Sequence, residues 1–294
     1  RSGDTMDLLI PFLTGLSLIA SSPLLDKAEA LWMASRFTES NSVLEKILAS
    51  GRTDPQENAE ALWRMARNYY DIGENLPMSA KVERYTLAVK IEDCGRRCMK
   101  ADPKNGSCYF WTGVGIGRQG TVRGILTQMR HAKEVHDLWM TALRFQRPYR
   151  CRDGTSSVPG DYYLALGIFC RLVPDLWIVQ VLLGVKGNLN TSVDSIRKAV
   201  SLEPERMEYL KELGVSLVCR GTRENRPQDI EEGKAYLMKT QTLPIIKGYD
   251  KIDKEHALLI ISHPDMACDY SRDGQQKISE EEARKIFDPR PPMQ

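Results

Sequence analysis

The feature that most constrains the fold is a spacing of proline and glycine that occurs twice in the 294-residue sequence. In each copy a proline is followed ten residues later by a glycine, and seven residues after that by a second glycine. The two copies are Pro103, Gly113 and Gly120, and then Pro204, Gly214 and Gly221. Because internal similarity of this kind marks stacked supersecondary units, the sequence predicts a repeat protein.

Two weaker copies lie before and between these: Leu62, Met65, Ala66, Tyr69 and Gly73, and then Tyr163, Leu166, Gly167 and Cys170, with Pro174 in place of the closing glycine. The large and small residues of each copy fall on one stripe of a helix. We expect the small residue to let a second helix approach closely, and the closing glycine to form a left-handed turn that ends the helix. A proline then ends the second helix. Each unit is therefore predicted to be a pair of helices.

The spacing divides the chain into three parts. Residues 1–23 form an apolar N-terminal segment, residues 24–262 form the helical-repeat domain, and residues 263–294 form a C-terminal tail with a short helix. The repeats are expected at about residues 57–103, 104–158, 159–204 and 205–244. One unit alone cannot bury its apolar face, so the units must stack. The predicted fold class is an all-α superhelix (α-solenoid) that resembles tetratricopeptide repeats.

Further helices are expected on both sides of the repeats. A leading pair falls at about residues 24–36 and 40–50, and a trailing helix at about 251–262. The N-terminal segment contains the most apolar stretch, residues 7–20, which is short for a membrane span. It packs under the first repeat, serves as an anchor, or is a signal sequence that is removed. The sequence therefore leaves three localisations open: the protein is cytoplasmic, membrane-associated or exported.

Several motifs resemble the regulator of microtubule dynamics family over about residues 24–262. Residues 61–67 (ALWRMAR) are similar to the family's opening "LLWRLAR", and residues 110–113 (FWTG), with Gly120 and residues 123–125 (RGI), are similar to its second unit. Residues 161–167 (DYYLALG), followed by Val173 and Pro174, resemble its third unit. The resemblance implies a helical-repeat protein linked to microtubules, or to tethering and lipid handling at membrane contact sites. It implies no set of catalytic residues.

Composition and cysteine count narrow the function class. Hydrophobic residues make up 42% and charged residues 27% of the chain, as in ordinary globular proteins. The net charge is +2, so the overall charge does not favour binding to nucleic acid. The seven cysteines are an odd number in a long chain, which argues against a disulfide framework and mildly favours a reducing compartment. Cys170 and Cys219 lie in apolar helical patterns and are expected to be free thiols.

A basic stretch at residues 118–152 is the first candidate binding site. It contains eight Arg or Lys residues against two acidic residues. Its candidate ligand-binding residues are Arg118, Arg123, Arg130, Arg144 and Arg147. Arginine binds carboxylate and phosphate in a planar fork, so the stretch could hold an acidic tail or a lipid headgroup. The alternative is a solvated helix face on which the arginine stems cover apolar surface.

An apolar insertion at residues 173–185 is the second candidate. It includes Trp177 and Leu182, whereas the turns between repeats are ordinarily short and polar. The insertion could line a groove for a hydrophobic ligand or a partner helix. Alternatively, it folds back and fills the superhelix.

The C-terminal tail contains a candidate calcium loop. Its oxygen-bearing residues Asp269, Ser271, Asp273 and Glu280 follow the alternate spacing of such loops, and Gly274 stands at the sixth position. Against this, Gln276 occupies a position that is ordinarily hydrophobic. As an alternative, Ser279 and Glu282 fit a capping box at the start of a helix from Glu280 to Phe287. Calcium is the only cofactor that the sequence suggests.

These observations favour a non-catalytic scaffold that binds a protein or peptide on the concave face of a superhelix. A carrier or tether for a hydrophobic ligand such as a lipid is the alternative. Residues 115–120 fit the dinucleotide fingerprint G-x-G-x-x-G, but they lie in a helical pattern without the strand that this motif requires. An enzyme is therefore disfavoured. The partner's identity and the oligomeric state stay open.

Overall fold

The computed structural model describes residues 22–50, 54–123, 129–147, 158–173 and 175–272. All regular secondary structure in these ranges is helical, which confirms the all-α repeat fold. The helices are α1 (Pro23–Met33), α2 (Phe37–Ala49), α3 (Pro55–Glu74), α4 (Lys81–Ala101), α5 (Gly106–Arg123), η1 (Met129–His131), α7 (Ala132–Arg144), α8 (Val158–Leu172), α9 (Trp177–Leu183), α10 (Leu189–Leu202), α11 (Met207–Arg223), α12 (Pro227–Thr242), α13 (Asp250–Ser262) and η2 (Pro264–Cys268). No helix in the described ranges is both long and apolar enough to cross a membrane.

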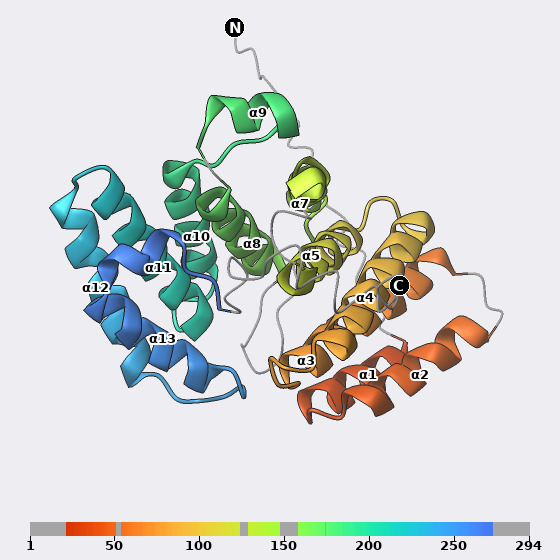
Figure 1. The fold of residues 1–294 in the computed structure, drawn as a ribbon. Coiled ribbons are helices and arrows are strands. Elements are labelled where there is room, and N and C mark those ends of the chain that lie inside the picture. The colour runs from red at the N-terminus through yellow and green to blue at the C-terminus, as the bar shows by residue number, and fades with distance from the viewer. Residues whose placement is uncertain (1–21, 51–53, 124–128, 148–157, 174, 273–294) are drawn as a thin grey trace, which may run out of the picture.

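The helices pack in consecutive pairs, as a tetratricopeptide-like superhelix requires. The extensive contacts are those of α3 with α4, α4 with α5, α8 with α10, and α11 with α12. Figure 1 shows the pairs following an arc from α1 to α13. The ends of this arc approach each other, because Lys247, in the loop before α13, has its ammonium 5.1 Å from the centre of the Trp32 ring on α1. The inner side of the arc is therefore enclosed by both halves of the chain.

Helix starts and ends follow local chemistry. The side chain of Asp54 accepts a hydrogen bond from the backbone N–H of Gln56 at 2.9 Å, and Pro55 occupies the first position of α3. In the same way, Asn188 caps α10 through the backbone N–H of Thr191 at 2.8 Å. Helices α4 and α10 end at Ala101 and Leu202, two residues before a proline in each case.

Glycines of the repeat allow neighbouring helices to pack closely, but the left-handed turns predicted at the closing glycines are wrong. A Cβ on Gly214 would lie 2.6 Å from Cγ of Leu237, so α12 approaches α11 as the repeat predicts. The closing glycines Gly120 and Gly221 do not form left-handed turns, because both lie inside helices. A Cβ on Gly221 would lie 2.6 Å from Cγ1 of Ile230, so this position also serves the contact between helices.

Two cysteine pairs correct the expectation of free thiols. Cys98 is bonded to Cys108, and Cys219 is bonded to Cys268, with Cα atoms 5.1 and 4.7 Å apart. Cys219 is thus not the free core thiol that its apolar surroundings indicated. Sequence spacing could not reveal the pair, since its two members are 49 residues apart and meet only when η2 packs against α11. Cys170 is a buried free thiol, as expected.

The apolar core is divided along the chain. One cluster joins α1 to α5 with α7 and Tyr162, and two further clusters unite α8 and α10 to α13 with η2. Between these parts lies a group of paired charged side chains.

Candidate functional site

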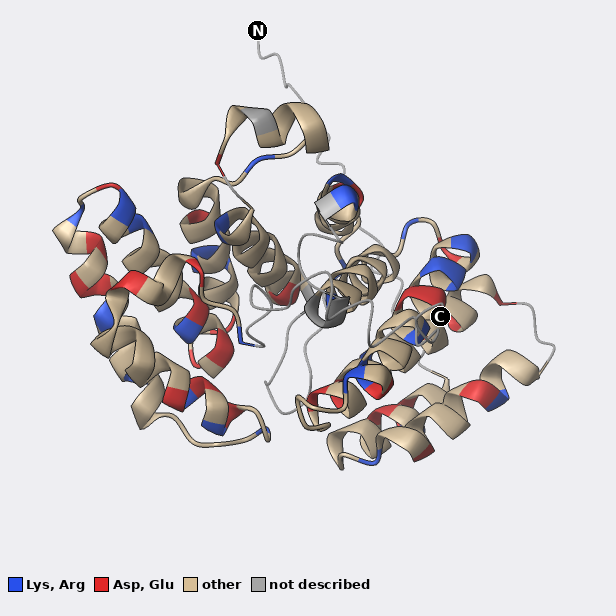
Figure 2. Ribbon diagram, in the orientation of Figure 1, with Lys and Arg blue, Asp and Glu red and all other residues tan. Residues whose placement is uncertain are grey.

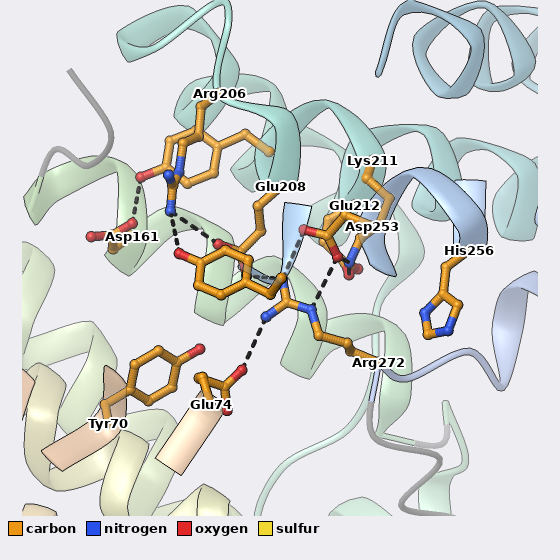
Figure 3. A network of polar contacts seen from close by, with 12 residues as sticks. Tyr70, Glu74, Asp161, Arg206, Glu208, Lys211, Glu212, Asp253, His256 and Arg272 are labelled. Atoms are coloured by element: carbon orange, nitrogen blue, oxygen red, sulfur yellow. Dashed lines mark hydrogen bonds and ion pairs between the residues drawn. The ribbon is translucent and has the colours of Figure 1, made fainter. Parts of the chain in front are cut away.

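The inner side of the arc carries a set of paired charges from both halves of the chain, hereafter the inner network (Figure 3). Its members are Glu74 on α3, Arg118 on α5, Arg206, Glu208, Lys211 and Glu212 at the start of α11, Asp253 on α13, and Arg272 after η2. These charges lie well away from bulk water, which is costly unless each one is paired. The partners of each charge therefore decide what the inner network can do.

Arg272 is the centre of the inner network. Its Nη2 donates to Oε1 of Glu208 at 2.6 Å, and its Nε donates to Oδ1 of Asp253 at 3.0 Å. Its Nη1 donates to Oε2 of Glu74 at 3.3 Å. The guanidinium also lies 4.8 Å from the centre of the Tyr249 ring. One side chain therefore connects α3 of the first half with α11 and α13 of the second (Figure 3).

Lys211 is a fully buried cation within this group. Its Nζ donates to Oδ1 of Asp253 at 2.7 Å and lies 2.9 Å from Oε1 of Glu212. Burial alone would lower the pKa of Lys211, but these two carboxylates outweigh it and hold the pKa well above its usual value. Lys211 is therefore a cation near neutral pH, which argues against a role as general base there.

Glu208 stays ionised because cations surround it. Burial would raise the pKa of this carboxyl, but the charges of Arg272, Arg206 and Lys211 outweigh burial and lower the pKa to about 2. Arg206 contributes through Nη2, which lies 3.3 Å from Oε2 of Glu208 and donates to the Tyr249 hydroxyl at 3.1 Å. The carboxylate is thus fixed by partners on two sides.

Glu74 on α3 is the carboxylate that the first half of the chain contributes to the inner network. Nη2 of Arg118 lies 2.8 Å from Oε1 of Glu74 and also donates to the Tyr70 hydroxyl at 2.8 Å. Arg84 lies nearby, with Nη2 3.6 Å from the same carboxylate oxygen. Glu74 therefore has two cationic partners besides Arg272.

The segment that delivers Arg272 is anchored at several points. The disulfide between Cys219 and Cys268 ties η2 to α11, and Arg171 of α8 donates to the carbonyl oxygen of Ala267 at 2.9 Å. Tyr270 is 6% exposed, and its hydroxyl lies 3.0 Å from Nδ1 of His256. Arg272 comes two residues after this aromatic anchor and reaches the inner network from the end of the described chain.

The structure does not gather the predicted basic residues into one site. Arg118 points into the inner network, whereas Arg147 is half-exposed and donates to Asp102 at 2.8 Å. Arg130 is exposed and donates to Nε2 of the adjacent His131, and Arg144 lies 5.8 Å from the Phe145 ring. The side chain of Arg123 lies outside the described residues. Of the other four, only Arg118 takes part in the inner network.

The apolar insertion does not line a pocket through Trp177 and Leu182. These side chains are 72% and 74% exposed on α9, and Val181 between them is 70% exposed. Figure 1 shows α9 at the periphery of the arc, and Figure 2 shows it without a charged residue. Their outward position does not match a filling of the superhelix, and their contact with a ligand or partner stays a prediction.

The predicted calcium loop falls largely outside the described residues. Asp269 and Ser271 are described, but Asp273 and Glu280 are not. Among the described residues, no group of three or more metal-binding side chains comes together. The fourth position of the predicted loop is Arg272, a cation whose guanidinium binds carboxylates of the inner network.

A separate cavity of about 430 Å³ lies between α2, α3 and α4. Four charged residues contribute to its walls: Glu45, Lys90, Asp93 and Arg97. Cys94 also lines it, and burial raises the pKa of this thiol to about 12, so it is not ionised near neutral pH. The rest of its wall is made by Leu48, Ala49, Met65 and Tyr69, so the cavity has mixed walls and offers no activated nucleophile.

Sequence reasoning missed the members of the inner network on α11, although a signal was present. Residues 207–223 carry apolar side chains on every face of the helix, as the positions of Tyr209, Leu210 and Val215 show. A helix that is apolar all round is buried, so charges within it must be paired. Lys211 and Glu212 could have been singled out on that ground, but their partners could not have been named.

Comparison with known proteins agrees with this architecture. The model of the family "Regulator of microtubule dynamics protein 1-3" matches residues 24–150, which is less than half of the chain. The chain is thus a tetratricopeptide-like protein that resembles this family. No curated protein matches the sequence.

Solved structures are similar to this chain at low sequence identity. The crystal structure of TTC0263, a thermophilic TPR protein in Thermus thermophilus, has a TM-score of 0.52 and 16% identity, covering 80% of this chain and 97% of that one. A crystal structure of MamA has a TM-score of 0.41 and 15% identity, covering 73% of this chain and 96% of that one. The former likeness supports the helical-repeat fold and carries no statement about a ligand.

Proposed function

We propose that this chain is a non-catalytic scaffold that binds an extended segment of a partner protein on the inner side of its superhelix. Stacked helix pairs provide a long curved surface of the kind that binds peptides. The observation that carries the proposal is the position of Asp269–Arg272. This non-helical segment of the chain already lies on the inner side and makes side-chain contacts to α3, α11 and α13.

The chemistry of the described residues supports a binding role over a catalytic one. The inner network consists of carboxylates that accept hydrogen bonds from arginine and lysine, and its lysine is a cation near neutral pH, because neighbouring carboxylates raise its pKa. The free thiols Cys94 and Cys170 have pKa values raised by burial to about 12 and about 11. A site of paired charges positions a ligand, but it supplies no activated nucleophile or base.

A carrier for a hydrophobic ligand is the alternative. The exposed residues Trp177 and Leu182 offer apolar area for such a ligand, but their outward position does not enclose it. Small-molecule sites bury most of the surface of their ligand, so an exposed helix alone is a poor carrier site. The scaffold is therefore the better supported of the two functions.

The test is a selection of peptides from a random display library with the full chain, followed by hydrogen exchange of the chain with a selected peptide bound. The scaffold role predicts slower exchange in α3, α5, α8 and α11 and no change in α2. Slower exchange confined to α9 would contradict it. Native mass spectrometry with lipid extraction tests the alternative. A lipid present at near-stoichiometric amount would support the carrier function in place of the scaffold function.

A further inference from the structure

Building on the proposed function, we infer that the inner network contains a binding site for an arginine side chain of a partner protein, which Arg272 of this chain fills when the partner is absent. Three carboxylates and an aromatic ring surround the guanidinium of Arg272. They are Glu74, Glu208, Asp253 and Tyr249. The partner is an extended segment that carries an arginine.

The geometry selects a guanidinium over an ammonium. Arg272 uses Nε and Nη2 together on Asp253, at 3.0 Å to Oδ1 and 3.1 Å to Oδ2, while its Nη1 faces Glu74. This two-point contact requires the planar fork of arginine, because lysine carries its charge at one nitrogen. The Tyr249 ring adds a face on which the planar cation can lie. Shape and charge therefore specify the same ligand group.

Arg272 can leave the inner network without leaving any of its three carboxylates unpaired. Glu74 keeps Arg118 at 2.8 Å, Glu208 keeps Arg206 at 3.3 Å, and Asp253 keeps Lys211 at 2.7 Å. Removing one member of a buried pair is strongly destabilising when it leaves an uncompensated charge. Here each carboxylate keeps a second cation, so the site persists when its arginine is exchanged.

The position of Arg272 in the chain suits exchange as well. The disulfide at Cys268 and the buried ring of Tyr270 keep Arg272 close to the site, which gives it a high effective concentration. A partner must compete with this tethered arginine. Binding is therefore weakened in the native chain and strengthened when Arg272 is absent.

The experiment compares the native full chain with its Arg272→Ala variant. The probe is a fluorescent, acetylated peptide with the sequence of residues 269–273, Asp-Tyr-Ser-Arg-Asp. The control peptide has citrulline in place of arginine, which keeps the planar shape and removes the charge. Fluorescence anisotropy measures binding, and circular dichroism checks that both chains are folded. We expect the arginine peptide to bind the variant about tenfold or more tightly than it binds the native chain, and more tightly than the citrulline peptide.

A folded Arg272→Ala variant that binds both peptides equally would overturn the inference. Should that variant fail to fold, Arg272→Lys replaces it, with the same expected preference, since lysine cannot make the two-point contact. A second measurement uses the native chain alone: excess arginine peptide should speed hydrogen exchange in residues 264–272, and unchanged exchange at saturation would count against displacement. A dimer of the native chain that Arg272→Ala abolishes would also overturn the inference, because the occupant would then be a second copy.

These results separate the inference from the scaffold function. If library peptides without arginine bind the native chain and the variant equally on the inner side, the scaffold stands and the arginine site does not. If no peptide binds either chain, the scaffold function itself fails.

Discussion

Helices α11 and α9 depart in opposite ways from the usual rule of apolar inside and polar outside. On α11, Lys211 is fully buried and Glu212 is 4% exposed. On α9, Trp177 and Leu182 are 72% and 74% exposed. The first departure is costly, because burying charge requires compensating partners in fixed positions. The second costs little, because an exposed apolar side chain loses no hydrogen bond.

The difference shows which side chains determine how the helices pack against one another. On α11, Lys211 pairs with Asp253 of α13, and Glu212 pairs with Arg171 of α8. Glu208 pairs with Arg272, which also reaches Glu74 of α3, so these charges fix how the segments meet. The exposed side chains of α9 impose no such constraint on the rest of the chain. We therefore expect large effects from changes in the inner network and small ones from changes on α9.

The largest effect is expected for Asp253→Asn. This substitution keeps the shape of the side chain but removes the fully buried carboxylate that pairs with Lys211 and Arg272. Lys211 keeps Glu212, and Arg272 keeps Glu74 and Glu208, but the new amide NH2 places a donor against a donor of Arg272 at a fully buried position. We expect a loss of about 3 kcal/mol in the free energy of unfolding, measured by urea titration. The matched control is Glu232→Gln, which breaks a half-exposed pair with Arg197 and should cost at most about 1 kcal/mol. Equal losses for the two variants would remove the distinction between the inner network and the surface.

An intermediate effect is expected from pH at Glu208. Its pKa in the folded chain is about 2, below the usual 4.5, so the unfolded chain binds a proton first as pH falls. The stabilisation from this carboxylate is therefore fully present above about pH 5 and is lost as pH falls from there toward 2. Urea titrations of the native chain and Glu208→Gln between pH 7 and 3 should show a stability difference that shrinks below pH 5. A difference that is constant over this range would mean that Glu208 titrates alike in both states.

The sequence allowed the fold to be predicted better than the site. The spacing of proline and glycine depends on contacts between neighbouring helices, so a local pattern reveals the repeat at Gly214. The inner network depends on contacts between distant segments, such as Glu74 with Arg272, 198 residues apart. Hydropathy along the chain contains no information on such a pair. It also drew attention to Trp177 and Leu182, because an apolar run shows composition and not the direction in which its side chains point.

The smallest effect is expected for Leu182→Ala on α9. Since Leu182 is 74% exposed, the substitution should change the free energy of unfolding by no more than about 0.5 kcal/mol. The matched control is Leu217→Ala on α11, where the leucine is fully buried and its loss should cost about 2–5 kcal/mol. Thermal and urea unfolding of both variants provide the comparison. A loss at Leu182 as large as that at Leu217 would mean that α9 is covered in solution, and it would return the apolar insertion to consideration as part of a binding site.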